Sequence, residues 1–273
     1  MLLSIRHRTH YRYEPAAARV ALKLKLFPAI TASQRPRSWT VTVNGEAPQM
    51  RLVNSYGDEE AVWLGHEGAS EVEVLAEGVV STSDTQGVIR GWKMAARPAM
   101  FLRETRLTAP SEEIAALARG ATAGKHGLAA AHALSAAVRE AVDYRTGSTD
   151  AESTADEALR QGAGVCQDHA HLLIAGARTL GAAARYVVGY LFVSEGDQPE
   201  LATEQETHAW AELWIDGLGW VGFDPSNRIC PTDHYVRLAA GLDARDAAPL
   251  RGSVTGTMAE SLSAEVQVTQ AQQ

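Results

Sequence analysis

The chain has 273 residues, of which 45% are hydrophobic and 21% charged, and its formal net charge is −8 at pH 7. This length allows one large domain or two smaller ones with a buried core, and no apolar run approaches the roughly 18–20 residues of a membrane-spanning helix. The acidic balance argues against nucleic acid or an anionic membrane as the main partner. Because the first residues also lack the pattern of a signal peptide, we expect a cytoplasmic protein.

The first 90 or so residues are predicted to form strands. From Ile5 to Tyr13, apolar or neutral residues alternate with arginines, which we interpret as the wet face of a strand rather than a binding patch. Alternation returns from Val20 to Phe27, and a strand over 39–43 runs into Asn44-Gly45, which is typical of a hairpin turn. Further strands are predicted around 61–64 and 71–80. This spacing favours a small antiparallel sandwich or barrel-like module.

The next stretch, from about residue 95 to 181, is alanine-rich and is predicted to be helical. Ser111 is a suitable N-cap for a first helix because acidic residues follow it in the first turn. Thr154 and Glu157 have the spacing of a capping box, so a short helix is expected to begin there and to end near Gly162. The other predicted helices run from about 128 to 142 and from Cys166 to Gly181.

After this helical region the pattern returns to strands, predicted at 185–193, 208–215 and 220–224. The segment from Leu262 to Val268 alternates again, and both a returning edge strand and a frayed tail are compatible with it. The sequence therefore predicts an α+β fold. An N-terminal antiparallel β sandwich-like module would cover residues 1–92, a core with a helix packed on an antiparallel sheet residues 93–240, and a C-terminal extension residues 241–273.

Cysteine chemistry is suggested by the surroundings of Cys166. Cys166 and Cys230 are the only cysteines, too few for a disulfide scaffold, and no CxxC pair indicates a zinc site. Gly162 and Gly164 release the backbone just before Cys166, and an uninterrupted helical run follows it. Unpaired N–H groups and the positive dipole end at a helix N-terminus favour thiolate over thiol, and they can also donate to an oxyanion. The alternative is a small buried hydrophobic residue, as most lone cysteines are.

A thiolate nucleophile needs a proton donor, and His208 is the best placed histidine. His208 opens a predicted strand, and a turn at 216–219 leads into a second strand that ends at Asp224. A two-residue loop would point Asp224 away from His208. A three-residue loop at 216–218 would place the two side chains diagonally, with Cβ atoms roughly 7–8 Å apart or less. An odd or bulged turn therefore permits a His–Asp pair.

A metal hydrolase can be drawn from Asp168, His169, His171 and His208. The two neighbouring histidines fall two apart on a predicted helix, on roughly opposite faces, so they would not converge on one ion. Both histidines also lie too close to Cys166 along the same helix start to be oriented freely toward its sulfur. The sequence has no calcium-loop pattern of the EF-hand kind, and no metal or other cofactor is expected.

Several motifs, taken together and in order, resemble the transglutaminase-like superfamily, a branch of papain-type cysteine chemistry. The motifs of the core are Gly164-Val165-Cys166, Arg178, the segment 181–190, His208-Ala209-Trp210 and the segment 219–227. The segments 8–13 and 23–28 resemble the β module that precedes this domain in many bacterial members. Two departures are mild: Ser226 stands where threonine is common, and residues 54–58 only loosely echo an Asp…Gly-Asn turn of the module.

The resemblance implies a papain-like core with Cys166 as the nucleophile, His208 as the general acid/base and Asp224 as the residue that orients His208. The implied reaction is acyl transfer: the thiolate attacks an amide carbonyl, the imidazolium protonates the leaving amine, and water or another amine resolves the thioester. The resemblance favours a protease or amidase that acts on peptide or isopeptide bonds. An amine-accepting transglutaminase and a non-catalytic, protein-binding member are the alternatives.

Three further residues are supporting candidates. The hydroxyl of Tyr144 could assist the oxyanion, Asp168 either caps its own helix or shapes the site, and Trp210 either walls the cleft or belongs to the core. Cys230 lies outside every motif and is expected to be structural. The expected partner is a peptide or protein amide substrate, without nucleic acid or membrane, and a homo-oligomer stays open.

Overall fold

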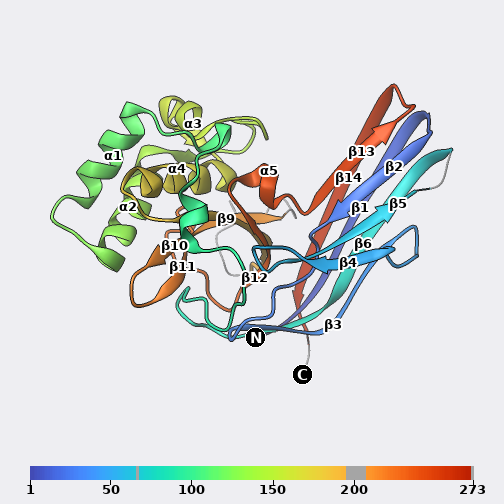
Figure 1. Cartoon of the computed structure of the whole chain (residues 1–273), viewed down its shortest axis with the longest axis horizontal. Coiled ribbons are helices and arrows are strands. Elements are labelled where there is room, and N and C mark those ends of the chain that lie inside the picture. Colours follow the sequence, from blue (N-terminus) through green and yellow to red (C-terminus); the bar gives the residue numbers. More distant parts are fainter. Residues whose placement is uncertain (66–67, 195–206, 272–273) are drawn as a thin grey trace.

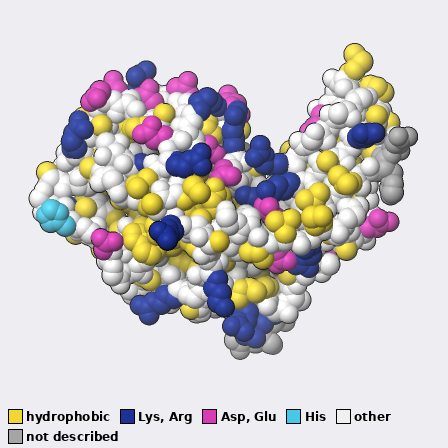
Figure 2. Space-filling view, viewed as in Figure 1, with side chains coloured by type: hydrophobic (Ala, Val, Ile, Leu, Met, Phe, Trp, Pro, Cys, Tyr) yellow, Lys and Arg dark blue, Asp and Glu magenta, His cyan; other side chains and the backbone are white. Residues whose placement is uncertain are grey.

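The computed structural model describes residues 1–65, 68–194 and 207–271. The predicted α+β fold is confirmed: Figure 1 shows a lobe in which helices gather around a sheet, beside a lobe of long strands. Within the described ranges, no helix is long and apolar enough to cross a membrane. Figure 2 shows that positive and negative side chains are interspersed on the viewed face and that the surface is hollowed between the two lobes.

The strand lobe consists of two antiparallel four-stranded sheets, with strand orders β14-β1-β6-β3 and β13-β2-β5-β4. Its strands are β1 (Leu2–Ala17), β2 (Arg19–Leu24), β3 (Gln34–Val43), β4 (Met50–Val53), β5 (Glu59–Leu64), β6 (Ala69–Thr82), β13 (Leu250–Thr255) and β14 (Ala259–Gln270). Both sheets therefore take their outer strands β13 and β14 from the C-terminal part of the chain (Figure 1). The boundaries at 92 and 240 stay predictions.

Strand β1 shows why the alternating pattern produces this lobe. Ile5 is buried on one face, while Arg6 and Arg8 are exposed on the other. The arginines lie opposite acidic residues of β6: Arg6 Nε is 3.5 Å from Glu77 and Arg8 Nε is 3.3 Å from Glu73. The interpretation of these arginines as the solvent-exposed face of a strand is therefore confirmed, because they pair with acidic residues of the neighbouring strand in solvent.

The hairpin expected at Asn44-Gly45 is only partly formed. Asn44 and Gly45 do adopt the left-handed backbone of a tight turn, with φ of 51° and 81°, but the turn closes only an isolated bridge between Val43 and Glu46. Strand β4, which follows, joins the other sheet, while β3 pairs with β6. The local turn signal was right and the pairing it suggested was wrong, because sheet membership depends on distant partners.

The second lobe contains the helices and the sheet β11-β10-β9-β12. Its elements are η1 (Pro98–Leu102), η2 (Arg106–Thr108), α1 (Glu112–Thr122), α2 (Gly127–Ala141), β7 (Asp143–Tyr144), α3 (Ala155–Gln161), β8 (Ala163–Gly164), α4 (Cys166–Thr179), β9 (Ala184–Leu191), β10 (His208–Ile215), β11 (Gly219–Phe223), β12 (Tyr235–Gly241) and α5 (Ala244–Ala247). Helix α4 is buried from Asp168 to Arg178 because the sheet covers one side and α1, α2 and α3 cover the other. Because other elements cover this helix on all sides, its N-terminus is held in a fixed position.

The capping residues expected from the sequence mark the helix ends. Ser111 accepts from the N–H of Ile114, and Thr154 forms the capping box with Glu157 at the start of α3. Helix α3 ends at Gly162, which has a left-handed φ of 66°. That turn leads directly through β8 to the first residue of α4.

A buried ionic cluster joins the two lobes. Glu212 of β10 accepts from Arg185 Nε at 2.6 Å and from Arg237 Nε at 3.0 Å. Arg237 of β12 also donates to Asp58 of the strand lobe at 3.0 Å, and the second oxygen of Asp58 accepts from the Ala240 N–H at 2.9 Å. The carboxylates and Arg185 are at most 1% exposed. The cluster contains two cations and two anions, so these four side chains together carry no net charge.

Candidate active site

The N-terminus of α4 places Cys166 at the edge of the core. Val165 is the N-cap, and Cys166 is the first helical residue, partly exposed, while the helix is buried from Asp168 to Arg178. Gly164 pairs with Tyr144 in the short parallel ladder of β7 and β8. A Cβ on Gly164 would lie only 2.7 Å from the Asp168 Cβ, so a larger residue would displace the start of the helix. The glycine before the nucleophile position is thus required by close packing.

The hairpin of β10 and β11 brings Asp224 to His208. Ile215 pairs with Gly219, so the loop contains residues 216–218, and Ala211 pairs with Phe223. The next position places Asp224 opposite Trp210, diagonal to His208, as the three-residue alternative predicted. Gly217 and Gly219 have φ values of 81° and 83°, which this turn needs and which other residues rarely adopt.

The His208 ring connects Asp224 to Cys166. Its Nε2 lies 2.7 Å from Asp224 Oδ2, and Cys166 lies near enough for its charge to act on the ring. Because Nε2 faces the carboxylate, Nδ1 is the nitrogen left for the sulfur. Burial alone would lower the pKa of His208, but the charges of Asp224 and Cys166 and the hydrogen bonds to both raise it to about 10. The ring is therefore held as an imidazolium beside the sulfur.

Asp224 is held by more than the histidine. Its Oδ2 also accepts from Asn227 Nδ2 and from the Tyr235 hydroxyl, each at 2.7 Å, and Asn227 Nδ2 is 3.1 Å from the same hydroxyl. Burial alone would raise the pKa of Asp224, but His208 and these donors lower it below its ordinary value. Sequence reasoning assigned no role to Asn227 and missed Tyr235, because nothing in the local pattern around Tyr235 indicates that its strand returns beside the site.

The three supporting candidates lie near the triad in different ways. Trp210 is 2% exposed and packs in the core, with its ring 6.3 Å from His208 and 5.4 Å from Tyr235. Asp168 acts as a helix cap, since its Oδ2 accepts from the Val165 N–H at 2.8 Å and from Thr149 Oγ1 at 2.6 Å. The Tyr144 ring stacks at 6.2 Å on His169, one layer behind the nucleophile position.

The histidines of α4 point to separate partners. His169 Nδ1 is 2.9 Å from the Val165 carbonyl oxygen, whereas His171 Nε2 accepts from the Ala244 N–H at 3.0 Å. Among the residues that the structure describes, no group of three His, Cys, Asp or Glu side chains lies close enough to hold a metal ion. Neither histidine is part of the chain from Asp224 to Cys166.

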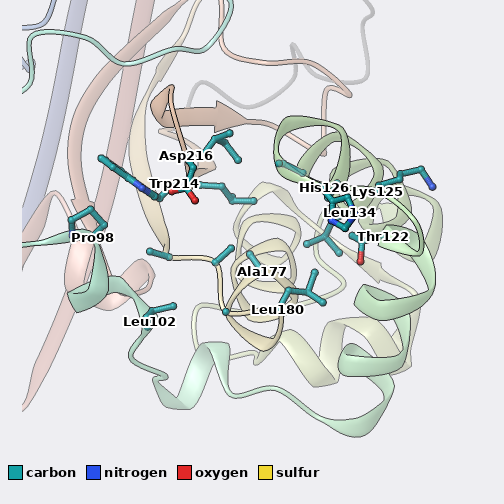
Figure 3. Close-up of a pocket in the computed structure, with 18 of the residues that line it drawn as sticks. Pro98, Leu102, Thr122, Lys125, His126, Leu134, Ala177, Leu180, Trp214 and Asp216 are labelled. Atoms are coloured by element: carbon teal, nitrogen blue, oxygen red, sulfur yellow. The ribbon is translucent and has the colours of Figure 1, made fainter.

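A cavity of about 580 Å³ lies at the opposite end of α4. Figure 3 shows Ala177 of α4 and Leu180 just after it at the cavity, with Trp214 of β10 on one side and His126, just before α2, on the other. None of the triad residues lines it. The cavity and the candidate catalytic residues therefore belong to different ends of the same helix.

Helix α4 thus begins at Cys166, and the adjacent sheet contributes the His208–Asp224 pair. Comparison with known proteins shows which family shares this fold. Residues 115–225 match the transglutaminase-like superfamily, and residues 3–81 match the bacterial transglutaminase-like N-terminal region. The chain therefore carries a transglutaminase-like core preceded by the bacterial transglutaminase-like N-terminal region.

Two relatives and one solved structure are similar over most of the chain. An uncharacterized protein of Mycobacterium leprae is 29% identical over 272 residues, covering 96% of each protein. An uncharacterized protein of Mycobacterium tuberculosis is 29% identical over 273 residues, covering 92% of this chain and 86% of its own. The crystal structure of a "putative cysteine protease" from Cytophaga hutchinsonii covers 100% of this chain and 91% of its own at 22% identity, with a TM-score of 0.77. That likeness extends the shared fold across both lobes.

Proposed function

We propose that this protein is a cysteine-dependent acyl-transfer enzyme that hydrolyses peptide or isopeptide amide bonds. The observation that carries the proposal is the buried Asp224–His208 pair, with Nε2 2.7 Å from Oδ2, next to the partly exposed Cys166. When a carboxylate holds an imidazolium beside a sulfur, the sulfur can act as the nucleophile and the imidazolium as the proton donor at the same place.

The reaction follows from the roles that these groups can take. The Cys166 thiolate adds to the amide carbonyl, and the electron pair of the C=O bond moves to oxygen. As the tetrahedral intermediate collapses, the C–N bond breaks and His208 gives its proton to the leaving amine. Water, deprotonated by the now neutral His208, then attacks the thioester and releases the acid. A primary amine in place of water would make the same site a transglutaminase.

Alkylation rates test the nucleophile before any substrate is known. Cys166 should react with iodoacetamide faster than Cys230 at pH 6–7, because it is partly exposed at a helix N-terminus beside the His208 ring, whereas burial, with the charge of Asp84, raises the pKa of Cys230. Cys166→Ala supplies the matched control by leaving only the second thiol. Equal rates for the two cysteines in the wild type would contradict the proposal.

Turnover on a library of peptides and isopeptides tests the reaction itself. We expect the wild type to release acid products and folded Cys166→Ala to release none. Adding a primary amine distinguishes the acceptors, since a transglutaminase would form the substituted amide at the expense of the acid. Unchanged turnover in Cys166→Ala would contradict the assignment of the triad. A reactive thiol without turnover of any library member would favour a binding role for the protein.

A further inference from the structure

The peptide unit between Val165 and Cys166 has both of its polar groups at the site. The peptide is planar, so the Val165 carbonyl and the Cys166 N–H point in opposite directions and turn together. At the first helical position the Cys166 N–H has no acceptor within its own helix. Whatever holds the Val165 carbonyl therefore also aims the Cys166 N–H.

The side chains of Asp168 and His169 hold Val165 from both sides. The Val165 oxygen lies 2.9 Å from His169 Nδ1 and also accepts from the backbone N–H groups of Asp168 at 3.0 Å and His169 at 3.1 Å. The Val165 N–H donates to Asp168 Oδ2 at 2.8 Å. The backbone just before Cys166 is thus clamped by one acid and one imidazole.

The ring of His169 has no freedom to point elsewhere. Its side chain is completely buried, its Nε2 lies 2.9 Å from the Val142 carbonyl oxygen, and one face stacks on Tyr144. Both nitrogens therefore face carbonyl oxygens, which can only accept. A ring nitrogen can bind a carbonyl oxygen only as a donor, so the 2.9 Å contact at Nδ1 is that of a ring N–H donating to Val165.

We propose that His169 is a positioning residue that donates from Nδ1 to the Val165 carbonyl and so aims and strengthens the Cys166 N–H as the donor to the substrate oxyanion. A hydrogen bond accepted by a peptide oxygen polarises the peptide, and its N–H becomes a stronger donor. The oxyanion is the oxygen that receives the carbonyl electron pair when the sulfur adds. This inference rests on the proposed function only for the reaction that the hydrogen bond would assist. The contact between His169 and Val165 does not depend on that function.

Two matched variants separate the two nitrogens of the ring. In His169→Asn the amide nitrogen can take the place of Nδ1 and still donate to Val165. In His169→Gln the amide nitrogen reaches toward the Nε2 position and Val142 instead. We expect His169→Gln to lower kcat/KM for amide substrates by about ten- to a hundredfold, since removing a whole oxyanion donor costs roughly 10²–10³. We expect His169→Asn to stay within about threefold of wild type.

The rate at which iodoacetamide alkylates Cys166 would change if the variants disturbed the helix start in general. Displacement of iodide forms no oxyanion, so both variants should alkylate Cys166 at the wild-type rate across pH 6–8. Loss of turnover together with loss of alkylation in His169→Gln would mean that the residue merely shapes the helix start, and would overturn the inference. Equal turnover in Asn, Gln and wild type would overturn it as well.

A measurement on the wild type decides the case if the variants do not fold or if no substrate is found. Nitrogen-15 chemical shifts distinguish a protonated ring nitrogen from one with a free lone pair. We expect a protonated His169 Nδ1; a lone pair at Nδ1 would overturn the inference whatever the turnover. Turnover that is absent from wild type and Cys166→Ala alike, together with a protonated Nδ1, would instead refute the proposed function and leave the contact standing.

Discussion

The sheet β11-β10-β9-β12 carries two buried charge clusters made from similar parts. In one, Asp224 accepts from His208, and in the other Glu212 accepts from Arg185 and Arg237. Both carboxylates are fully buried. The clusters differ in their cations: an imidazole can release its proton, whereas a guanidinium in a protein stays charged.

The clusters also differ in what lies beyond the cation. His208 is 9% exposed and reaches the partly exposed sulfur of Cys166, whereas Arg237 continues to Asp58 in the other lobe. One chain of charges therefore ends at a reactive group and the other at a lobe contact. Substitutions that keep shape and remove charge should affect turnover in the first cluster and stability in the second.

The largest effect is expected for Asp224→Asn. The amide keeps the size of the carboxylate but leaves the His208 imidazolium without its anion, so we expect kcat to fall by about 10³–10⁴, as in other triads. Turnover of the best library substrate measures it, with Asp216→Asn in the exposed turn as the control. A loss of kcat below tenfold would contradict the idea that the Asp224 cluster serves turnover while the Glu212 cluster serves stability.

The next largest effect is expected for Glu212→Gln. Two guanidinium groups would lose their shared buried anion, and breaking a buried pair costs roughly 3–5 kcal/mol of unfolding free energy. Urea denaturation followed by circular dichroism measures the change. Asp58→Asn should cost less, because Asp58 accepts from only one guanidinium, that of Arg237, and its other partner is the uncharged Ala240 N–H. Equal losses would show that the lobe contact is as important as the core pair.

A pH series should distinguish the clusters on the alkaline side. The pKa of His208 is raised from 6.5 to about 10, so its contribution to stability is complete below pH 6.5 and is lost as the pH rises through about 10. The difference in unfolding free energy between wild type and His208→Gln should therefore narrow from pH 7 to 9. The difference between wild type and Glu212→Gln should stay constant there, because the pKa of Glu212 is lowered by the two arginines despite its burial.

The smallest effect is expected on the outer face of the strand lobe. Arg8 and Glu73 form a pair whose side chains are 44% and 42% exposed. Removing the pair with Arg8→Ala should change the unfolding free energy by less than about 0.5 kcal/mol. A change above 1 kcal/mol would show that exposed pairs contribute here as buried ones do.

Local rules predicted the parts of the site that neighbours along the chain determine. The glycines before Cys166 and the helical run after it located the helix start, and the parity of the 216–218 loop set the side of Asp224. These features depend on backbone conformation within a few residues. They could be predicted because nothing distant competes with them.

The missed parts depend on distant partners. Strand β12 has no alternation, because it is buried on both faces, and Arg237 within it resembles a surface residue in the sequence. Its burial is understandable only with Asp58, which lies 179 positions earlier. The same strand brings Tyr235 to Asp224. Neither pairing leaves a periodic signal, so sequence reasoning could not find them.

The pairing of β14 with β1 has a consequence for biosynthesis. Residues 3–14 of β1 align with residues 259–270, so β1 leaves the ribosome well before its partner does. At roughly 5–20 residues per second, the interval between them is on the order of ten to fifty seconds. During that time β1 has one open edge, to which another nascent chain could add a strand. Arg6, Arg8 and Arg12, alternating along it, place charges that discourage such pairing until the proper partner arrives.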